Sequence, residues 1–539
     1  MKKILQNRRV KKDDSGIALF WRERLSAFIH QEKGAGTGFY VLGAMALLVT
    51  AAFIVDTSTA TGDATQIKRA TDAAALAVGH QAIINGEEYS QEDITTLAYE
   101  YVKNNLGMNK ALSEKLVAGD VSVMEGQNSA TRKTYTVTVA FETKPSLLSL
   151  GARKQEVYST SEIVNRPTEI AFVMPVTGDM SEGDIRSLKS VSRSFVERML
   201  SSADGKRDNL WLSLVPYSQS VNVYDAEDAN RIRRWSMPGA LNPVELTSLF
   251  RSGYSSLADR RIPDRRANLL CMYRGLGREE NFFWDEPPVA QFGIYYRHDL
   301  PQNGSPGAPP ISWVGPNPDF GQATGVNDTR WMVADRGCPN AALLPLTNEE
   351  EKLNQRIAQF SARFNVNYAI AMGWAAAALS PNMRGSDGWG DATLPLDFNL
   401  DGNGDGQKVI VMMANTIGNW FDTDGYNFKS NQFSGSTGSD VTREFAQQRF
   451  RDLCASFRAR NIKFYFVGIR PGDPEDFGRN LFDAEATPGL LICTEGEKRM
   501  SFIDGAGFGA EGVEDQLIRR LDRIAGQIET EGGYVRLVE

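Results

Sequence analysis

A long uncharged run near the N-terminus dominates the pattern of apolar and polar positions. Residues 34–55 carry no charged side chain, and the stretch Gly38–Val55 is almost wholly apolar. A helix rises about 1.5 Å per residue, so about 20 apolar residues cross a hydrocarbon core about 30 Å thick. The run therefore predicts a transmembrane helix. A buried helix of a soluble domain and a cleaved signal peptide are the alternatives, but the run is long for a signal peptide and lacks a small-x-small cleavage site before Asp56.

Small residues continue the helical pattern beyond the span. Ile67, Ala70, Ala74 and Ala77 recur at spacings of three and four, which predicts that the helix continues with a narrow small-residue stripe. Because small side chains let helices approach closely, we expect this stripe to pack against helices of other subunits, in lipid or just outside it.

The next segment predicts a small α+β unit. Residues 88–117 have the composition of a further helix, and residues 121–123, 134–141 and 155–164 alternate apolar and polar positions. Alternation with a period of two predicts strands, here of a small antiparallel sheet. A long N-terminal helix that leads into such a sheet is typical of a pilin-like subunit, and Pro167 ends the unit.

A different pattern begins at Thr168. Short apolar runs typical of buried strands alternate with stretches typical of helices, which predicts a parallel, doubly wound α/β sheet. The expected strands are 169–174, 210–216, 408–413 and 462–469, the expected helices are 183–200, 441–460 and 512–528, and a last run covers 534–538.

An insertion at about 222–345, rich in Pro, Gly and aromatic residues, interrupts these elements. A loop of this length in a compact domain is usually functional or locally disordered. Aromatic side chains are enriched in protein interfaces, so Trp284, Trp313 and Trp331 predict a contact surface here.

Length and charge limit the classes of function. The 539 residues suffice for two or three domains, and the patterns divide them into a basic arm at 1–33, a transmembrane and pilin-like region at 34–166, and a doubly wound domain at 167–539. The net charge is −8 and the dense basic segment is the arm, so nothing points to nucleic-acid binding. The arm has nine Lys and Arg against four acidic residues, which by the positive-inside rule places it in the cytoplasm and the chain after Asp56 outside.

The four cysteines all follow the span, in an oxidising compartment if this orientation holds. Four cysteines allow three pairings. Sequence order and the domain organisation favour Cys271 with Cys338 and Cys454 with Cys493, and buried free thiols are the alternative.

Three groups of residues resemble the TadG-like proteins of the tight-adherence (Tad, or Flp) pilus system. The span ending at Asp56, followed by Gln66 and by Asp72 within Ala70–Ala77, is similar to the N-terminal signature of that family. Residues 168–180 and 214–218 resemble the opening of its von Willebrand factor A (vWA) domain. Further motifs, among them Gly337-Cys-Pro339, Leu379-Ser-Pro381 and Leu453-Cys454, follow the order of the family to the C-terminus.

The resemblance implies a non-enzymatic envelope or pilus-associated component, a minor pilin-like or tip subunit that presents a vWA domain for assembly or adhesion. Implied partners are the membrane, other pilus or pilin-like subunits, and an extracellular surface ligand. The implied location is the bacterial inner membrane, with the C-terminal domain periplasmic or extracellular on the pilus. Related pilins are cut after a Gly with a Glu five residues on, but Gly36 is followed by Thr37-Gly-Phe-Tyr-Val41, which argues against such processing.

The resemblance also implies a metal site, and the sequence departs from it. An active vWA domain holds a divalent cation with Asp-x-Ser-x-Ser, a Thr and a further Asp, and hard oxygen ligands suit Mg²⁺. Here Pro175 stands at the first Asp, Thr177 and Asp179 follow it, and Asn415 stands near the last Asp position. The Thr position falls near residues 365–368, which contain neither Ser nor Thr. We expect a degenerate site that requires no metal.

A second metal candidate is a calcium loop just before the strand at 408–413. Carboxylate and amide oxygens stand at positions 1, 3, 5 and 9 with Gly at 6, as in a calcium-binding loop, and the candidate residues are Asp397, Asn399, Asp401, Asn403 and Asp405. Lys408 occupies position 12, where a bidentate Glu is expected. An acidic Asn/Gly turn is the alternative.

Catalytic arrangements are poor, and we expect no enzyme. The chain has three histidines, His30, His80 and His298, and no nucleophile elbow or phosphate-binding loop. The alternatives to a structural pilus component are therefore a calcium-dependent surface adhesin and, more remotely, a surface hydrolase that uses His298.

Overall fold

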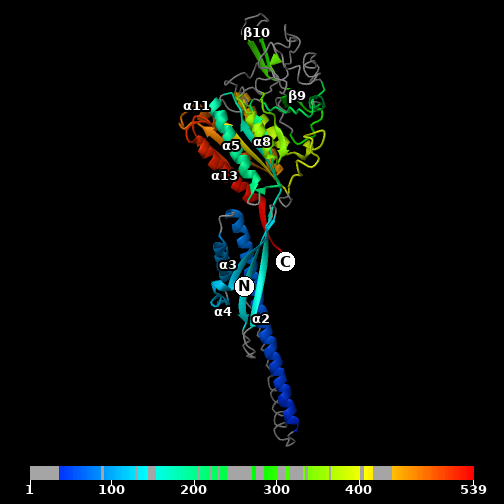
Figure 1. The fold of residues 1–539 in the computed structure, drawn as a ribbon, viewed down its shortest axis with the longest axis vertical. Coiled ribbons are helices and arrows are strands. Elements are labelled where there is room, and N and C mark those ends of the chain that lie inside the picture. The colour runs from blue at the N-terminus through cyan, green and yellow to red at the C-terminus, as the bar shows by residue number, and fades with distance from the viewer. Residues whose placement is uncertain are drawn as a thin grey trace, which may run out of the picture.

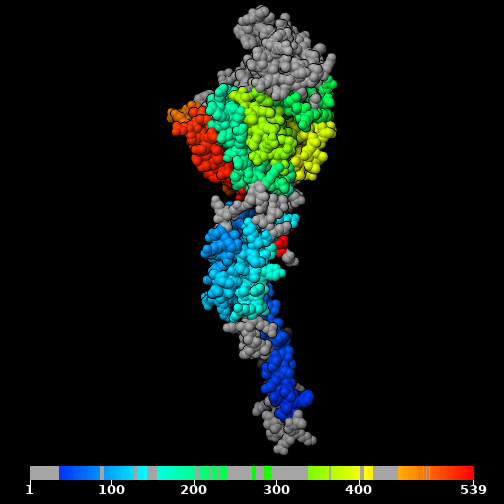
Figure 2. All heavy atoms as spheres, viewed as in Figure 1, coloured from blue at the N-terminus to red at the C-terminus, as the bar shows by residue number. Residues whose placement is uncertain are grey.

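The computed structural model describes most of the chain. The described residues are 35–85, 90–107, 109–128, 132–143, 153–178, 180–202, 205–218, 220–228, 230–238, 270–274, 284–294, 297–301, 310–314, 332–333, 338–362, 366–400, 406–416 and 440–538. The molecule is elongated: one helix extends from a small α+β domain, and a wider α/β domain lies at the opposite end (Figures 1 and 2). The basic arm lies outside the described residues.

The first domain is built on α2, a helix of 51 residues from Ala35 to Asn85. At about 1.5 Å per residue it is about 75 Å long, more than twice what a bilayer core requires. Three antiparallel strands follow in sequence, as expected: β1 (Val121–Asn128), β2 (Arg132–Thr143) and β3 (Arg153–Asn165). Short elements α3 (Gln91–Asn105), α4 (Lys110–Ser113) and the 3-10 turn η2 (Ala118–Asp120) connect helix and sheet.

The small-residue stripe of α2 packs on this sheet and on α3, within the same chain. Ile67, Ala70, Ala74 and Val78 are buried together with Val137 and Val139 of β2 and Ala98 of α3. The expectation that this stripe meets helices of other subunits is therefore wrong for its buried residues. The reason is that small side chains serve close packing against any neighbour, and here the neighbour is the chain's own sheet.

The C-terminus returns to the first domain. Residues 533–538, which sequence analysis placed at the end of the second domain, form β17 (Gly533–Val538) and pair antiparallel with β3. The sheet order is β1-β2-β3-β17. The C-terminus accordingly lies beside the first domain in Figure 1.

The second domain contains a six-stranded sheet in the order β13-β7-β4-β14-β15-β16. Five of its strands are parallel, and β13 is antiparallel to β7 at one edge. In chain order this is 3-2-1-4-5-6, an order common in doubly wound sheets. The strands are β4 (Thr168–Pro175), β7 (Leu210–Tyr217), β13 (Leu344–Thr347), β14 (Gln407–Asn415), β15 (Ile462–Arg470) and β16 (Met500–Asp504).

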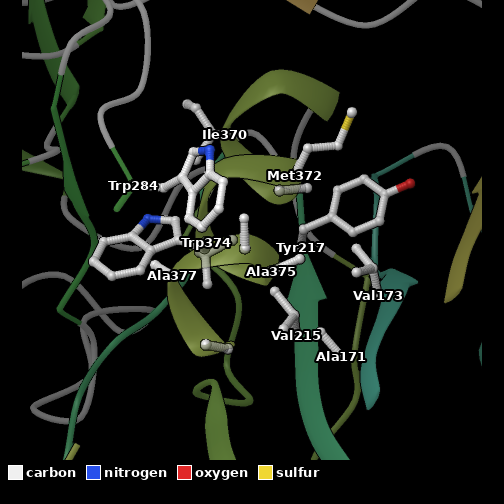
Figure 3. Packing of buried hydrophobic residues seen from close by; sticks show 14 of the residues in the cluster. Ala171, Val173, Val215, Tyr217, Trp284, Ile370, Met372, Trp374, Ala375 and Ala377 are labelled. Atoms are coloured by element: carbon white, nitrogen blue, oxygen red, sulfur yellow. The ribbon is translucent and has the colours of Figure 1, made fainter. Parts of the chain in front are cut away.

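Helices cover both faces of this sheet. One face packs against α5 (Glu182–Leu200), α8 (Glu350–Ala358) and α13 (Val513–Gly532). The other packs against α9 (Tyr368–Ala378), α10 (Asp440–Ala459), α11 (Phe477–Glu485) and α12 (Thr487–Cys493). Figure 3 shows α9 beside β4 and β7, with Met372 and Ala375 on the side of Tyr217 and Val215 and with Trp374 on the opposite side, near Trp284.

Described parts of the insertion extend this second face. Trp284 is buried, packs edge-on against Phe457 and donates its indole N–H to the Ser456 hydroxyl at 2.9 Å. It therefore belongs to the core, and its predicted place in a contact surface is wrong. The Trp313 side chain and Trp331 lie outside the described residues.

The remaining short elements are β5 (Ser201–Ser202), β6 (Gly205–Lys206), α6 (Arg231–Trp235), β8 (Met272–Tyr273), β9 (Gly293–Ile294), β10 (Arg297–Pro301), β11 (Pro310–Val314), β12 (Met332–Val333), η6 (Pro381–Met383) and η8 (Glu497–Arg499).

Both predicted disulfides are confirmed. Cys271 is bonded to Cys338, which joins the middle of the insertion to its C-terminal part, and Cys454 is bonded to Cys493, which joins α10 to α12. All four residues are buried. Each bond closes a long loop and thereby limits the unfolded chain.

Candidate functional site

The lower part of α2 is the first candidate site. Every residue from Gly36 to Ala51 is exposed, including large apolar side chains such as Phe39 and Leu47. A continuous exposed apolar surface of this size is unusual in water and marks a contact with lipid or protein. By length and composition, α2 is the one helix among the described residues that could cross a membrane.

Polar residues of the N-terminal signature attach α2 to its own domain. The Asp72 carboxylate accepts hydrogen bonds from the Ser159 hydroxyl of β3 at 2.5 Å and from the Lys68 ammonium at 2.8 Å. Lys68 also donates to the Tyr158 carbonyl. Gln66 accepts from the Asn109 amide at 3.0 Å, which links α2 to the turn before α4. Gln66 and Asp72 thus fix α2 to the sheet and to the α4 turn of the first domain.

The second candidate site lies where the order of the parallel strands reverses. Chain segments leave β4 and β14 toward opposite faces, because α5 follows β4 on one face and α10 follows β14 on the other. Ligands of doubly wound sheets bind outside the carboxyl ends of the strands at such a point. Pro175 and Thr177 lie at the end of β4, and Asn415 lies at the end of β14. The predicted residues Pro175, Thr177 and Asn415 thus lie at one edge of the sheet, and Asp179 lies outside the described residues.

Two tyrosines close this edge. Tyr217, at the end of β7, donates its hydroxyl to the Met413 carbonyl of β14 at 2.9 Å, so its side chain bridges strands on either side of β4. Tyr368, at the start of α9, donates to the Asn415 carbonyl at 3.0 Å. Their rings meet edge to face at 5.9 Å. Sequence analysis missed both residues, since a tyrosine at the end of a strand or at the start of a buried helix has no signal that separates it from ordinary core.

The oxygens at this edge do not fit the metal site that the vWA resemblance implies. Pro175 offers no ligand side chain, and the Thr177 and Ser220 hydroxyls are buried without a hydrogen bond to any described residue. The Asn415 carbonyl already accepts from Tyr368. Over the described part of the chain, no group of three or more His, Cys, Asp or Glu side chains is arranged to hold a metal ion. The described hydroxyls and carbonyls of this edge are by themselves a weak ligand set for Mg²⁺.

The N-terminus of α5, beside this edge, is satisfied from within the chain. Asp184 accepts from the Ser181 backbone at 2.8 Å in a capping box and from the Gly509 N–H at 2.7 Å. Burial alone would raise the pKa of Asp184, but hydrogen bonds from Gly509, Ser181 and Phe508 outweigh it and lower the pKa below its ordinary value. The contact is close: a methyl group on Gly509 would lie 2.8 Å from the Gly183 carbonyl carbon.

The candidate calcium loop is only partly described. Asp397 pairs with Arg384 at 2.7 Å, and the Asn399 amide donates to the Gly406 carbonyl. Asp401, Asn403 and Asp405 lie outside the described residues. Lys408, at position 12 of the candidate loop, is buried. Its ammonium pairs with the buried carboxylate of Glu169.

The Glu169–Lys408 pair was not found from the sequence. The two residues are direct neighbours on β4 and β14, and the pair also binds the Leu379 carbonyl and the Leu396 N–H. Burial lowers the pKa of Lys408, and Glu169 acts in the opposite direction. A buried pair of this kind is costly to break from one side only. Its role here is to fix the loop at 396–400 against the sheet.

The histidines form no catalytic arrangement among the described residues. His80 is exposed on α2, and β10 contains the His298 backbone, paired with Trp313 and Met332. His30 lies outside the described residues.

Comparison with known proteins gives one match that carries an argument. Residues 34–81 match the family model described as "Putative Flp pilus-assembly TadE/G-like". No curated protein matches. The matched segment covers the exposed apolar part of α2, Gln66 and Asp72. This chain therefore contains a TadE/G-like Flp pilus-assembly segment at its N-terminal helix.

Solved structures show weaker similarity. The pilus adhesin SpaC from Lactobacillus rhamnosus GG aligns with 77% of this chain and 35% of its own, at 10% identity and a TM-score of 0.30. RrgA, a pilus adhesin from Streptococcus pneumoniae, aligns with 77% of this chain and 49% of its own, at 9% identity and a TM-score of 0.27. Proximal thread matrix protein 1 from the mussel byssus aligns with 70% and 50%, at 7% identity and a TM-score of 0.26. This chain spans between about a third and a half of these structures, and TM-scores of this size carry no argument about fold or function.

Proposed function

We propose that this chain is a non-catalytic, single-span component of a Tad-type pilus apparatus. The observation that carries the proposal is the match of residues 34–81 to the Flp pilus-assembly family. The exposed apolar half of α2 serves as the anchor, and the two folded domains stand outside the cytoplasm. The excess of nine basic over four acidic residues in the N-terminal arm supports this orientation.

The second domain serves as a vWA-like module for assembly or attachment. A six-stranded, doubly wound sheet with one antiparallel edge strand supports this assignment. The module works without a divalent metal at the strand ends, since Pro175 replaces a carboxylate and Tyr217 and Tyr368 occupy the carbonyls there. Its partners are other pilus subunits or a ligand on an external surface.

Removal of the chain from its cells tests the proposal. We expect loss of surface pili, counted by electron microscopy, or loss of attachment at normal pilus number, and recovery of both when the chain is restored. Normal pili and normal attachment in its absence would contradict the proposal. Fractionation of sheared pili from membranes then separates a tip subunit from a resident of the inner membrane.

Metal removal tests the second part. Partner binding should be unchanged by EDTA, and added Mg²⁺ or Ca²⁺ should leave the thermal unfolding temperature of the purified chain unchanged. Binding that EDTA abolishes and Ca²⁺ restores would favour the calcium-dependent adhesin instead. Asp397→Ala then serves as the control, because a calcium loop would lose its first ligand.

A further inference from the structure

The two domains are connected at two places. The first connection runs from β3 to β4 through Arg166 and Pro167, and the second runs from α13 to β17 through Gly532 and Gly533. The connections lie side by side: the Arg166 N–H donates to the Gly532 carbonyl at 3.0 Å, and the Arg166 guanidinium lies 5.0 Å from the centre of the Tyr534 ring. A single connection would let one domain swivel about the other, whereas two bonded connections oppose rotation.

The strand β17 has a fitted seat in the first domain. It pairs with β3 over six residues, from Gly533 opposite Asn165 to Val538 opposite Thr160. Val535 packs on α2 at Gly79, where an added methyl group would lie 2.5 Å from Val535 Cγ1. Gly533 contacts the same face of α2 one turn further on, since a methyl group there would lie 3.2 Å from Ile83. Gly79 is therefore needed for the close approach of β17.

The helix that leads into β17 is held at its last turn. Glu529 binds Arg198 at 2.6 Å and also Arg207, so the turn is linked to α5 and to the hairpin after it. Glu531 binds Lys463 of β15 at 2.8 Å and Arg499 at 2.9 Å. Two glutamates, each with two cations, thus fix the end of α13 to the second domain at the point where the chain leaves for the first.

From these contacts we infer that β17 is an interdomain clasp, a strand anchored in the second domain that completes the sheet of the first and holds the two domains in one orientation. The inference stands independently of the pilus assignment. Its consequence is mechanical: tension applied to the second domain reaches α2 through two strands instead of one. It also means that the sheet of the first domain receives its fourth strand from the end of the chain.

Distance measurement between the domains tests the clasp. Spin labels at Lys115→Cys and Asp515→Cys, both exposed positions, report the separation of the domains in the full chain by double electron–electron resonance. The native cysteines are all in disulfides and do not take the label. We expect a narrow distance distribution for the otherwise unaltered chain and a broad one for Gly79→Ala, in which the new methyl group displaces Val535.

Two further variants serve as controls. Gly62→Ala makes the same change on the same helix where nothing lies within 4 Å, and should leave the distribution narrow. Val535→Ala combined with Gly79→Ala removes the clashing methyl groups and should restore the narrow distribution. Near-ultraviolet circular dichroism and melting verify that both domains of each variant are folded.

The outcomes are distinct. A broad distribution in a folded Gly79→Ala chain, reversed by Val535→Ala, supports the clasp. An unchanged distribution in Gly79→Ala, or in a chain ending at Gly532, overturns it. Loss of the fold of the first domain in both variants overturns it as well, because β17 would then be an ordinary structural strand and not a device that orients domains.

Discussion

The two halves of α2 belong to one continuous helix and have opposite surroundings. In the lower half large apolar side chains are exposed: Leu47 is 74% exposed and Leu48 is 70% exposed. In the upper half small side chains are buried: Ala74 and Ala75 are 0% exposed. Water would favour the reverse, with large apolar residues inside. The difference indicates that the lower half requires an apolar environment that the chain itself does not supply, whereas the upper half has found its partner in its own sheet.

The polar residues of the N-terminal signature belong to the upper half of α2. Asp72 and Gln66 are both engaged within the first domain, with Ser159 and Asn109 respectively. The segment that matches the pilus-assembly family therefore combines two tasks, an anchor in its first part and attachment of that anchor to the body in its second.

A charge in the lower half should have the largest effect. Leu47→Arg places a cation where the anchor crosses the bilayer, at a cost of about 2.5–3.5 kcal/mol near the centre of a span. We expect the share of the chain that resists extraction from membranes to fall strongly. Thr57→Arg, ten residues further on and exposed, should have little effect. Equal retention of both variants would contradict a membrane position for Leu47.

An enlarged side chain in the upper half should come next. Ala74→Leu overfills a fully buried position against the sheet, which typically costs about 1–3 kcal/mol. The unfolding temperature of the purified chain in detergent should drop. The matched change Ala46→Leu, in the exposed half, should leave it unchanged. A drop of similar size in both variants would remove the distinction between the halves.

Loss of the attachment at Asp72 should have a smaller effect. Asp72→Ala removes the acceptor of the Ser159 hydroxyl and of Lys68, and a hydrogen bond of this kind contributes about 1 kcal/mol. Amide hydrogen exchange of the middle of β3, around Ser159, and of α2 near Asp72 should become faster. Asp63→Ala, nine residues earlier at a half-buried position of the same helix, should not change that exchange.

Lowering the pH should destabilise the two folded domains before it releases the exposed half of α2 from the membrane. This effect on stability should be smallest near neutral pH. Burial alone would raise the pKa of Glu531, but Lys463 and Arg499 outweigh it and lower that pKa, as Gly509 and Ser181 do for Asp184. Because the folded pKa lies below the unfolded one, both carboxylates stabilise the fold above the unfolded pKa, and this stabilisation is lost as pH falls through the folded pKa. Near-ultraviolet circular dichroism should change below about pH 4, while membrane retention stays constant because residues 34–55 carry no charge.

Segments marked by a local run of apolar residues were predictable from the sequence. The strands expected at 169–174, 408–413 and 462–469 are found as β4, β14 and β15, because buried parallel strands are short continuous apolar runs. The sequence order of the cysteines also led to both disulfides. These features depend on local pattern or on chain order alone.

Features that depend on distant partners were not predictable. Helix α9 is buried on every side, so no amphipathic period marks Tyr368–Ala378. The pairing of β17 with β3 joins residues more than 360 positions apart in the sequence, and nothing in 534–538 distinguishes its partner. Likewise the sequence places Lys408 at the end of an acidic loop, whereas in the structure its ammonium pairs with Glu169 on the neighbouring strand.

Thiol accessibility along α2 tests whether this one helix lies partly in the membrane and partly against its own sheet, with the folded domains outside the cytoplasm. Single cysteines at Leu47, Thr57 and Ala74 would be exposed to a membrane-impermeant maleimide in spheroplasts, where the native disulfides do not react. We expect rapid labelling at Thr57, no labelling at Leu47, and labelling at Ala74 only after denaturation. Labelling of Leu47 as fast as Thr57, or protection of Thr57 until the membrane is permeabilised, would contradict this arrangement.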